Sequence, residues 1–222
     1  MDPEACREQL LQLSQNGKSL TDVWKPEQIE ALAHHKDAEI RYLTAELLAD
    51  GSEVPQAEDL LLELAGDPDT LVRVQAVDSL SAYPTEASFS AMETALDDPC
   101  ELVRSYGALG RGWVGMVLKK EGTVSLLQKH REASTAVREQ AACCEALYVL
   151  GRKEALEALL ELFPEGDAQA RCFILNGLQE LVNPYALDRI CRFLGEIPTA
   201  DLPPAVRSSK EELTLTCRNF TR

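Results

Sequence analysis

The sequence predicts an all-α fold, an α-α superhelix built from about six helix-hairpin repeats behind an N-terminal capping helix. A step in which an apolar residue precedes an arginine recurs along the chain, and these arginines are spaced by 32, 31, 34, 33 and 36 residues. Periods of this length indicate stacked supersecondary units. Apolar residues make up 45% of the chain but aromatic residues only 5%, which favours helices packed through leucine, alanine and valine over a β-sandwich.

The recurring step divides the chain into repeats. Its six occurrences are Ile40-Arg41, Val72-Arg73, Val103-Arg104, Val137-Arg138, Ala170-Arg171 and Val206-Arg207. We expect one solenoid domain, 1–222, whose capping helix lies within 1–20 and whose repeats cover approximately 21–51, 52–83, 84–115, 116–151, 152–182 and 183–217.

The capping helix is expected over about 3–15. Cys6, Leu10 and Leu13 recur at helical spacing, Asp2 can cap the first turn, and Gly17 can end the helix.

Each repeat is expected to contain two helices with apolar residues at steps of three and four. The first helices are expected at about 26–36, 55–66, 86–97, 121–132, 153–164 and 184–195. The second helices are expected at about 37–50, 69–82, 99–112, 134–151, 167–182 and 203–217, with the apolar-Arg step in the first turn.

An acidic residue stands six places before most of these arginines, in the turn between the helices. A carboxylate there can accept from N–H groups at the helix start and can also bind an arginine of its own or a neighbouring repeat. Because the pair recurs, we interpret it as a structural ladder and not as a catalytic acid–base set. The ladder residues are Arg41, Asp67, Arg73, Asp98, Arg104, Glu132, Arg138, Glu165, Arg171, Asp201 and Arg207.

Two segments carry a family resemblance. Asp67-Pro68-Asp69-x-x-Val72-Arg73-x-x-Ala76, and the corresponding segment from Asp98 to Ala108, resemble HEAT repeats of the short bacterial type also seen in phycobilisome-lyase-like proteins. The resemblance covers about 20–217 and implies an armadillo/HEAT-type α-solenoid with first helices on the convex side and second helices on the concave side. It fades at His35, which replaces the acid, and at Lys210 and Glu211, where alanine is expected.

Residues one, two and five places after each arginine are expected to face away from the core, toward the concave groove. They mix aromatic, amide and acidic groups, which suits a protein or peptide partner, although the aromatic residues could equally fill gaps between helices. Together with two residues of the glycine-rich stretch discussed next, the candidate binding residues are Tyr42, Glu46, Gln75, Asp78, Tyr106, Arg111, Trp113, Gln140, Phe173 and Asn176.

A glycine-rich stretch, Gly107–Gly115, interrupts the pattern of the third repeat. Because interior glycines weaken a helix, we expect this helix to end early or kink, with an unusual connection over about 113–120. The stretch is either a hinge, a recognition loop that presents Arg111 and Trp113, or a site of close helix packing.

The composition and charge of the chain limit the classes of partner that it is expected to bind. A balance of 22 basic against 37 acidic residues, net −15, disfavours nucleic acid and anionic membrane surfaces. Seven scattered cysteines without a C-x-x-C pair are expected to be reduced and mostly buried. No signal pattern or membrane-length apolar run stands out, so a cytoplasmic protein is expected. Adjacent side chains such as Cys143-Cys144 and His34-His35 cannot readily chelate one ion, so neither a metal nor another cofactor is expected.

The sequence therefore predicts a non-enzymatic, monomeric interaction scaffold that binds a protein or peptide in the concave groove. The resemblance also implies an alternative, an enzyme or chaperone of the bilin-lyase type that acts on a partner protein. A HEAT-like DNA glycosylase is a remote alternative, since its groove would need to be basic. The charge and aromaticity of the residues expected to face the concave groove distinguish these classes.

Overall fold

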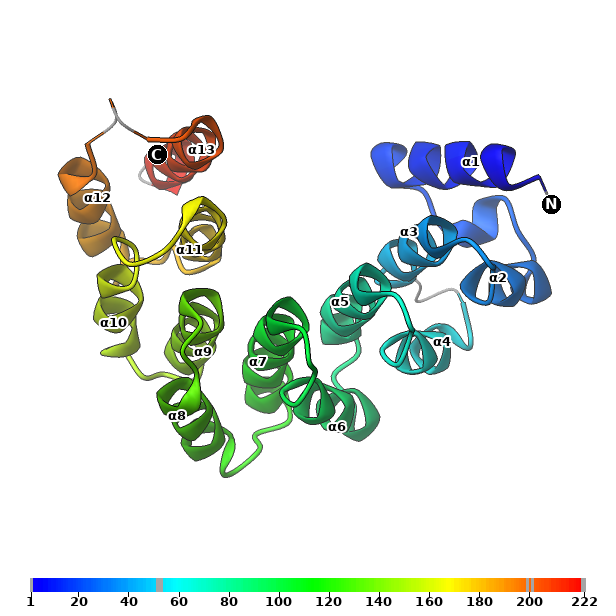
Figure 1. Cartoon of the computed structure of the whole chain (residues 1–222), viewed down its shortest axis with the longest axis horizontal. Coiled ribbons are helices and arrows are strands. Elements are labelled where there is room, and N and C mark those ends of the chain that lie inside the picture. The colour runs from blue at the N-terminus through cyan, green and yellow to red at the C-terminus, as the bar shows by residue number, and fades with distance from the viewer. Residues whose placement is uncertain (1, 51–53, 199, 201, 221–222) are drawn as a thin grey trace. The chain divides into compact units, whose positions relative to one another are not determined.

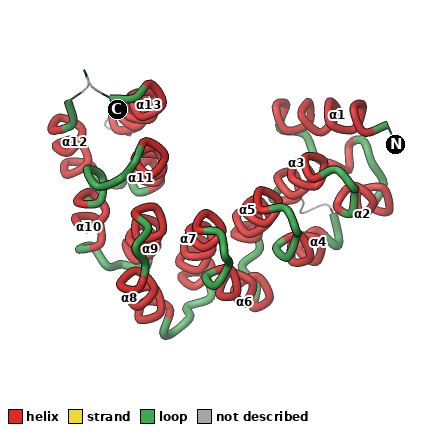
Figure 2. The backbone as a smooth tube through the Cα atoms, viewed as in Figure 1, coloured by secondary structure: helices red, strands yellow, loops and turns green. Residues whose placement is uncertain are grey.

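The computed structural model describes residues 2–50, 54–198, 200 and 202–220. Within these residues the chain is helical and has no strand (Figure 2). The predicted all-α fold of stacked helix hairpins is confirmed. The hairpins group into two compact units, Met1–Lys120 and Glu121–Arg222.

The first unit contains a capping helix and three hairpins (Figure 1). The second helices α3, α5 and α7 pack side by side with α1 against α3, and the first helices α2, α4 and α6 form the other layer. The helices are α1 Pro3–Asn16, α2 Pro26–Ala33, α3 Ala38–Leu48, α4 Ala57–Leu64, α5 Thr70–Ser79, α6 Glu86–Ala95 and α7 Glu101–Val117.

The second unit repeats this arrangement with three hairpins. Helix α11 packs between α9 and α13 in one layer, and α8, α10 and α12 form the other (Figure 1). The helices are α8 Thr123–Ala133, α9 Val137–Val149, α10 Ala155–Glu161, α11 Ala168–Glu180, α12 Leu187–Glu196 and α13 Pro204–Phe220.

Short polar side chains begin several of these helices. Asp37 and Asp69 precede α3 and α5, and each accepts a hydrogen bond from a backbone N–H of the first turn. Thr85 and Asp167 do the same for α6 and α11. These bonds satisfy donors that have no partner inside the helix, so the sequence itself fixes where the helices start.

Each unit has its own apolar core between its two layers. In the first unit Ile40, Leu61 and Leu80 are fully buried. In the second unit Leu175 and Ile190 are fully buried, and the Phe163 and Phe193 rings meet edge to face with centroids 5.3 Å apart. Both cores are therefore made mainly from aliphatic side chains at helical spacing, as the composition indicates.

The glycine-rich stretch does not break its helix, so that expectation is wrong. Helix α7 continues through Val117. A Cβ at Gly107 would lie 2.9 Å from the Ala95 Cβ, and one at Gly110 would lie 2.7 Å from the Met92 Cε, so both glycines allow close packing on α6. The packing between α6 and α7 outweighs the helix propensity that these glycines lack.

Candidate functional site

In the first unit, two arginines bridge neighbouring repeats. Arg41 donates from Nε and Nη2 to both carboxylate oxygens of Asp67, at 2.7 and 2.8 Å, and from Nη1 to the His35 carbonyl at 2.7 Å. Arg73 repeats the pattern with both oxygens of Asp98, at 2.8 and 3.1 Å, and with the Asp67 carbonyl at 2.9 Å. Each arginine thus joins the turn of its own repeat to the acid of the next.

The two acids also hold the turns that begin α5 and α7. Asp67 accepts from the Asp69 N–H and Asp98 from the Cys100 N–H, each at 2.8 Å. Burial acts to raise the pKa of both carboxyls, but the hydrogen bonds from the arginines and the backbone hold the pKa below its usual value. The third arginine, Arg104, donates to the Asp98 carbonyl at 2.8 Å.

The register shifts in the fourth repeat, which corrects the expected roles of Arg138, Gln140 and Glu132. Gln140 donates to the carbonyl of Ser134, six residues earlier, at 2.5 Å, as Arg41, Arg73 and Arg104 do in their repeats. Gln140 therefore occupies the ladder position, and Ser134 stands where the second and third repeats have Asp67 and Asp98. Arg138 lies two residues before that position and donates to Gln169 at 3.1 Å, while Glu132 is exposed.

The last two repeats also depart from the expected pairing. Arg171 donates to the carbonyls of Phe163 and Pro164, and Arg207 donates to that of Leu202. Glu165 is exposed, and Asp167 caps α11 in its place. The remaining ladder residue, Asp201, lies outside the described residues.

The second helices of the first unit bring three candidate binding residues together. Tyr42 and Glu46 lie on α3, one turn apart, and Asp78 lies on α5. Burial raises the pKa of the half-buried Tyr42 hydroxyl, and the negative charges of Glu46 and Asp78 raise it further. Glu46 also accepts a hydrogen bond from the Ser14 hydroxyl of α1 at 2.6 Å. We call Tyr42, Glu46 and Asp78 the acidic patch.

The other candidates of the first unit lie on α5 and α7. Gln75 is half-buried and donates to the Ser79 hydroxyl at 3.2 Å. Tyr106 is also half-buried. Trp113 is 40% exposed, and with Met116 and Val117 it forms an exposed apolar end of α7.

Arg111 is not presented at the surface, which corrects the expectation for this residue. It is only 6% exposed, and its guanidinium stacks 3.6 Å from the Phe89 ring centroid. Its Nη1 donates to the Phe89 carbonyl and also lies 2.9 Å from the Glu93 carboxylate. Arg111 therefore joins α7 to α6 and cannot line a groove.

In the second unit the candidates do not converge as the acidic patch does. Phe173 is half-buried against the core, and Asn176 is exposed on α11. Sequence analysis missed a buried carboxyl on α9, Glu145, and the pair formed by His130 Nε2 and Glu139 Oε1, which lie 2.5 Å apart. Neither has a local sequence signal, because both depend on contacts between helices.

The second unit also contains a mainly apolar cavity of about 470 Å³ beside α10, α11 and α12. Phe163, Phe193 and Leu202 line it together with Arg171 and Arg189. Elsewhere, no group of three histidine, cysteine or acidic side chains in the described residues is arranged to hold a metal ion. None of the described helices is long and apolar enough to cross a membrane.

Comparison with known proteins gives a family for part of the chain. Residues 26–110 match the family model described as HEAT repeats. This part of the chain consists of HEAT repeats. Both bidentate pairs, Arg41 with Asp67 and Arg73 with Asp98, lie within this HEAT-repeat region, as does the acidic patch.

No curated protein matches the chain. Among solved structures, one similar chain comes from the complex of CpcE and CpcF of phycocyanin lyase from Nostoc sp. PCC7120. It shares 15% identity with a TM-score of 0.47, over 89% of this chain and 95% of that chain.

Proposed function

We propose that this protein is a non-enzymatic interaction module whose first unit binds a basic peptide segment of a partner protein at the acidic patch. The observation that carries the proposal is the convergence of Tyr42, Glu46 and Asp78 from α3 and α5. An aromatic ring near two carboxylates offers both an apolar contact and a charge for a lysine or arginine side chain. Repeat folds of this kind present extended surfaces for binding, and the fold alone implies no catalytic activity.

The distribution of charge supports a basic partner. Residues 1–120 contain 22 acidic and 10 basic residues, so this unit carries −12 of the net charge of −15. Such a field accelerates association with a basic segment and repels phosphate backbones. It therefore also argues against the DNA glycosylase alternative.

The proposal is tested with an array of peptides matched in length and differing in charge, followed by fluorescence anisotropy on the tightest binder. Basic peptides should bind best, and added salt should weaken them. Glu46→Gln and Asp78→Asn should each weaken binding by about tenfold, equivalent to about 1.4 kcal/mol. Tyr42→Ala should weaken it at least as much.

Asp59→Asn is the matched control, because it removes one charge from an exposed residue of the first helix α4 in the same unit. We expect it to change the affinity less than twofold, as a change in overall field alone would. Equal loss from Asp59→Asn and the patch variants would reject the patch. A peptide array without preference for basic sequences would reject the proposal as a whole.

A second candidate function, a chaperone of the bilin-lyase type, is supported by the cavity beside α10, α11 and α12. Its volume of about 470 Å³ and its aromatic walls suit an apolar molecule, and a lining that contains both Arg171 and Arg189 and both Glu161 and Glu196 can bind polar groups of that molecule. A linear tetrapyrrole titrated into the protein should then change its visible absorption, and Phe193→Ala should reduce that change. An unchanged spectrum would reject this second function and leave the interaction module as the proposed function.

A further inference from the structure

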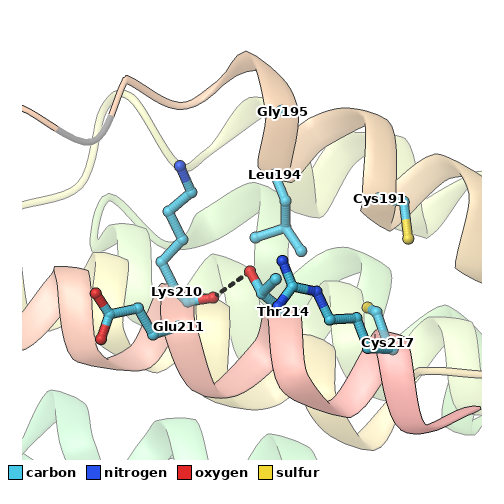
Figure 3. Close-up of a pocket in the computed structure, with 8 residues that line it drawn as sticks. Cys191, Leu194, Gly195, Lys210, Glu211, Thr214 and Cys217 are labelled. Atoms are coloured by element: carbon cyan, nitrogen blue, oxygen red, sulfur yellow. Dashed lines mark hydrogen bonds between the residues drawn. The ribbon is translucent and has the colours of Figure 1, made fainter.

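Two cysteines that are distant in sequence meet at the last hairpin. Cys191 lies on α12 and Cys217 on α13, and both side chains line the same cavity. Figure 3 shows Cys191 pointing from α12 toward α13, on which Cys217 lies. The fold brings the two cysteines to one cavity, because α12 packs directly against α13.

The pair combines one accessible thiol with one protected thiol. Cys191 is exposed, whereas Cys217 is only 3% exposed. Both line a cavity of about 580 Å³, together with Leu194 and Thr214 (Figure 3). A small oxidant can therefore reach Cys191 from solvent, and its reduced products can return to solvent the same way.

We propose that Cys191 and Cys217 form a reversible disulfide that bridges α12 and α13. Thiols that line one cavity on two packed helices form a disulfide when side-chain rotation brings their sulfur atoms to the bonding distance of about 2 Å. The bridge would join the two helices of the terminal hairpin and would make the stability of this hairpin depend on the thiol–disulfide balance around it.

The oxidant is a low-molecular-weight disulfide. The Cys191 thiolate attacks one of its sulfur atoms, which forms a mixed disulfide and releases the first small thiol. The Cys217 thiolate then attacks the Cys191 sulfur and expels the second small thiol. Two protein thiols lose two electrons and two protons, and the small disulfide gains them as two thiols.

The surroundings of Cys217 assign the order of these steps. Burial raises the pKa of the Cys217 thiol to about 11, and Cys191 beside it contributes. Cys217 is therefore mostly protonated at neutral pH and is a poor first nucleophile. Cys191, which meets solvent, reacts first, and Cys217 closes the bridge.

The adjacent pair Cys143 and Cys144 does not offer the same chemistry. Both are fully buried on α9, and burial raises the pKa of both thiols. Neighbours on a helix also point about 100° apart, which is unfavourable for disulfide geometry. The bridge is therefore specific to α12 and α13.

The test incubates the folded full-length protein with mixtures of reduced and oxidised glutathione, followed by thiol blocking and peptide mass mapping. We expect a peptide linked through Cys191 and Cys217 that has lost two hydrogen atoms, and its reversal by a dithiol reductant. The bridge should raise Tm by roughly 5 °C. Cys191→Ser changes an exposed residue, so it should fold normally and lose both the link and the rise in Tm.

Cys100→Ser is the matched control, because it removes a half-buried thiol from the other unit and should keep the link. Three results would overturn the proposal. They are a glutathione adduct that persists on Cys191, a link between other cysteines, and no oxidation of the folded protein at potentials where glutathione itself is mainly oxidised.

Discussion

The Glu145 carboxyl of α9 occupies the space that a side chain at position 177 of α11 would fill. A Cβ at Gly177 would lie 2.1 Å from Glu145 Oε2 and 2.9 Å from its Cδ. Glu145 is only 5% exposed, so its carboxyl is held between the two helices and not in solvent. Gly177 thus provides the space that the buried Glu145 carboxyl occupies, and substitutions at both positions test this contact.

Gly177→Ala should lower the free energy of unfolding of the second unit by about 1–3 kcal/mol, because the new methyl group forces Glu145 to move within a packed interface. Urea denaturation followed by circular dichroism measures the effect. Gly195→Ala on α12 is the control, since its Cβ would meet nothing within 4 Å. That change should be neutral or stabilise by up to about 1 kcal/mol. Equal destabilisation by both changes would contradict the close contact.

The stability of the second unit should fall as pH rises through the neutral range. Burial raises the pKa of Glu145 from 4.5 to about 8, and the Glu180 carboxylate adds to the effect. Between these values the unfolded chain has lost this proton while the folded chain keeps it. The unfolded state is then favoured by up to about 1.4 kcal/mol per pH unit, and the slope ends above about pH 8.

Glu145→Gln separates this contribution from all other titrations. The difference in unfolding free energy between the native protein and this variant should decrease from about pH 5 to pH 8, because glutamine does not titrate. Glu180→Gln removes the neighbouring charge and should move the upper end of this range to lower pH. Parallel pH profiles of the native protein and Glu145→Gln would show that Glu145 is ionised in the folded state.

Much of the fold follows from local chemistry, which explains why the sequence predicts it. Asp37 and Asp69 cap helices through their own neighbours, and the apolar positions recur with the helical period. The constant distance from each cap to Arg41 and Arg73 also places Glu46 and its counterpart Asp78 outside the apolar core. For these residues a one-dimensional pattern is sufficient.

The failures have a different physical origin, since each depends on a contact between helices. Val137-Arg138 matches the apolar-Arg pattern of the sequence. Because α9 begins at Val137, however, Gln140 and not Arg138 donates the hydrogen bond to the carbonyl six residues earlier. The sequence predicts an exposed Arg111, but in the structure its guanidinium stacks on the Phe89 ring. Glu145 gives no signal at all, because only its packing against Gly177 makes it unusual. A pattern along the sequence does not show which side chains from different helices lie next to each other.

The glycines of α7 should respond differently to alanine. At Gly107 the new Cβ meets the Ala95 Cβ at 2.9 Å and the Met92 carbonyl oxygen at 3.1 Å, and backbone cannot easily move. We expect Gly107→Ala to destabilise the first unit by about 1–3 kcal/mol. At Gly110 the new Cβ meets only the flexible end of Met92. Gly110→Ala should therefore lie within about 1 kcal/mol of the native protein, because better helix propensity offsets the shift of Met92.

Tryptophan fluorescence measures these two variants selectively, because both tryptophans, Trp24 and Trp113, belong to the first unit. A kinked or hinged α7 would tolerate both changes equally. A greater loss at Gly110 than at Gly107 would contradict the observed packing of α6 on α7.

The Arg73 and Asp98 pair should stabilise the first unit without taking part in binding. Its side chains are only 13% and 12% exposed, so removing either partner leaves a poorly solvated charge. Arg73→Ala and Asp98→Ala should each lower the unfolding free energy by about 1–3 kcal/mol, and the double variant should lose less than the sum. The more exposed pair of Arg189 and Glu157 is the comparison and should contribute less than about 1 kcal/mol. Unchanged Tm with lost peptide binding in Arg73→Ala would instead make this arginine part of the binding surface.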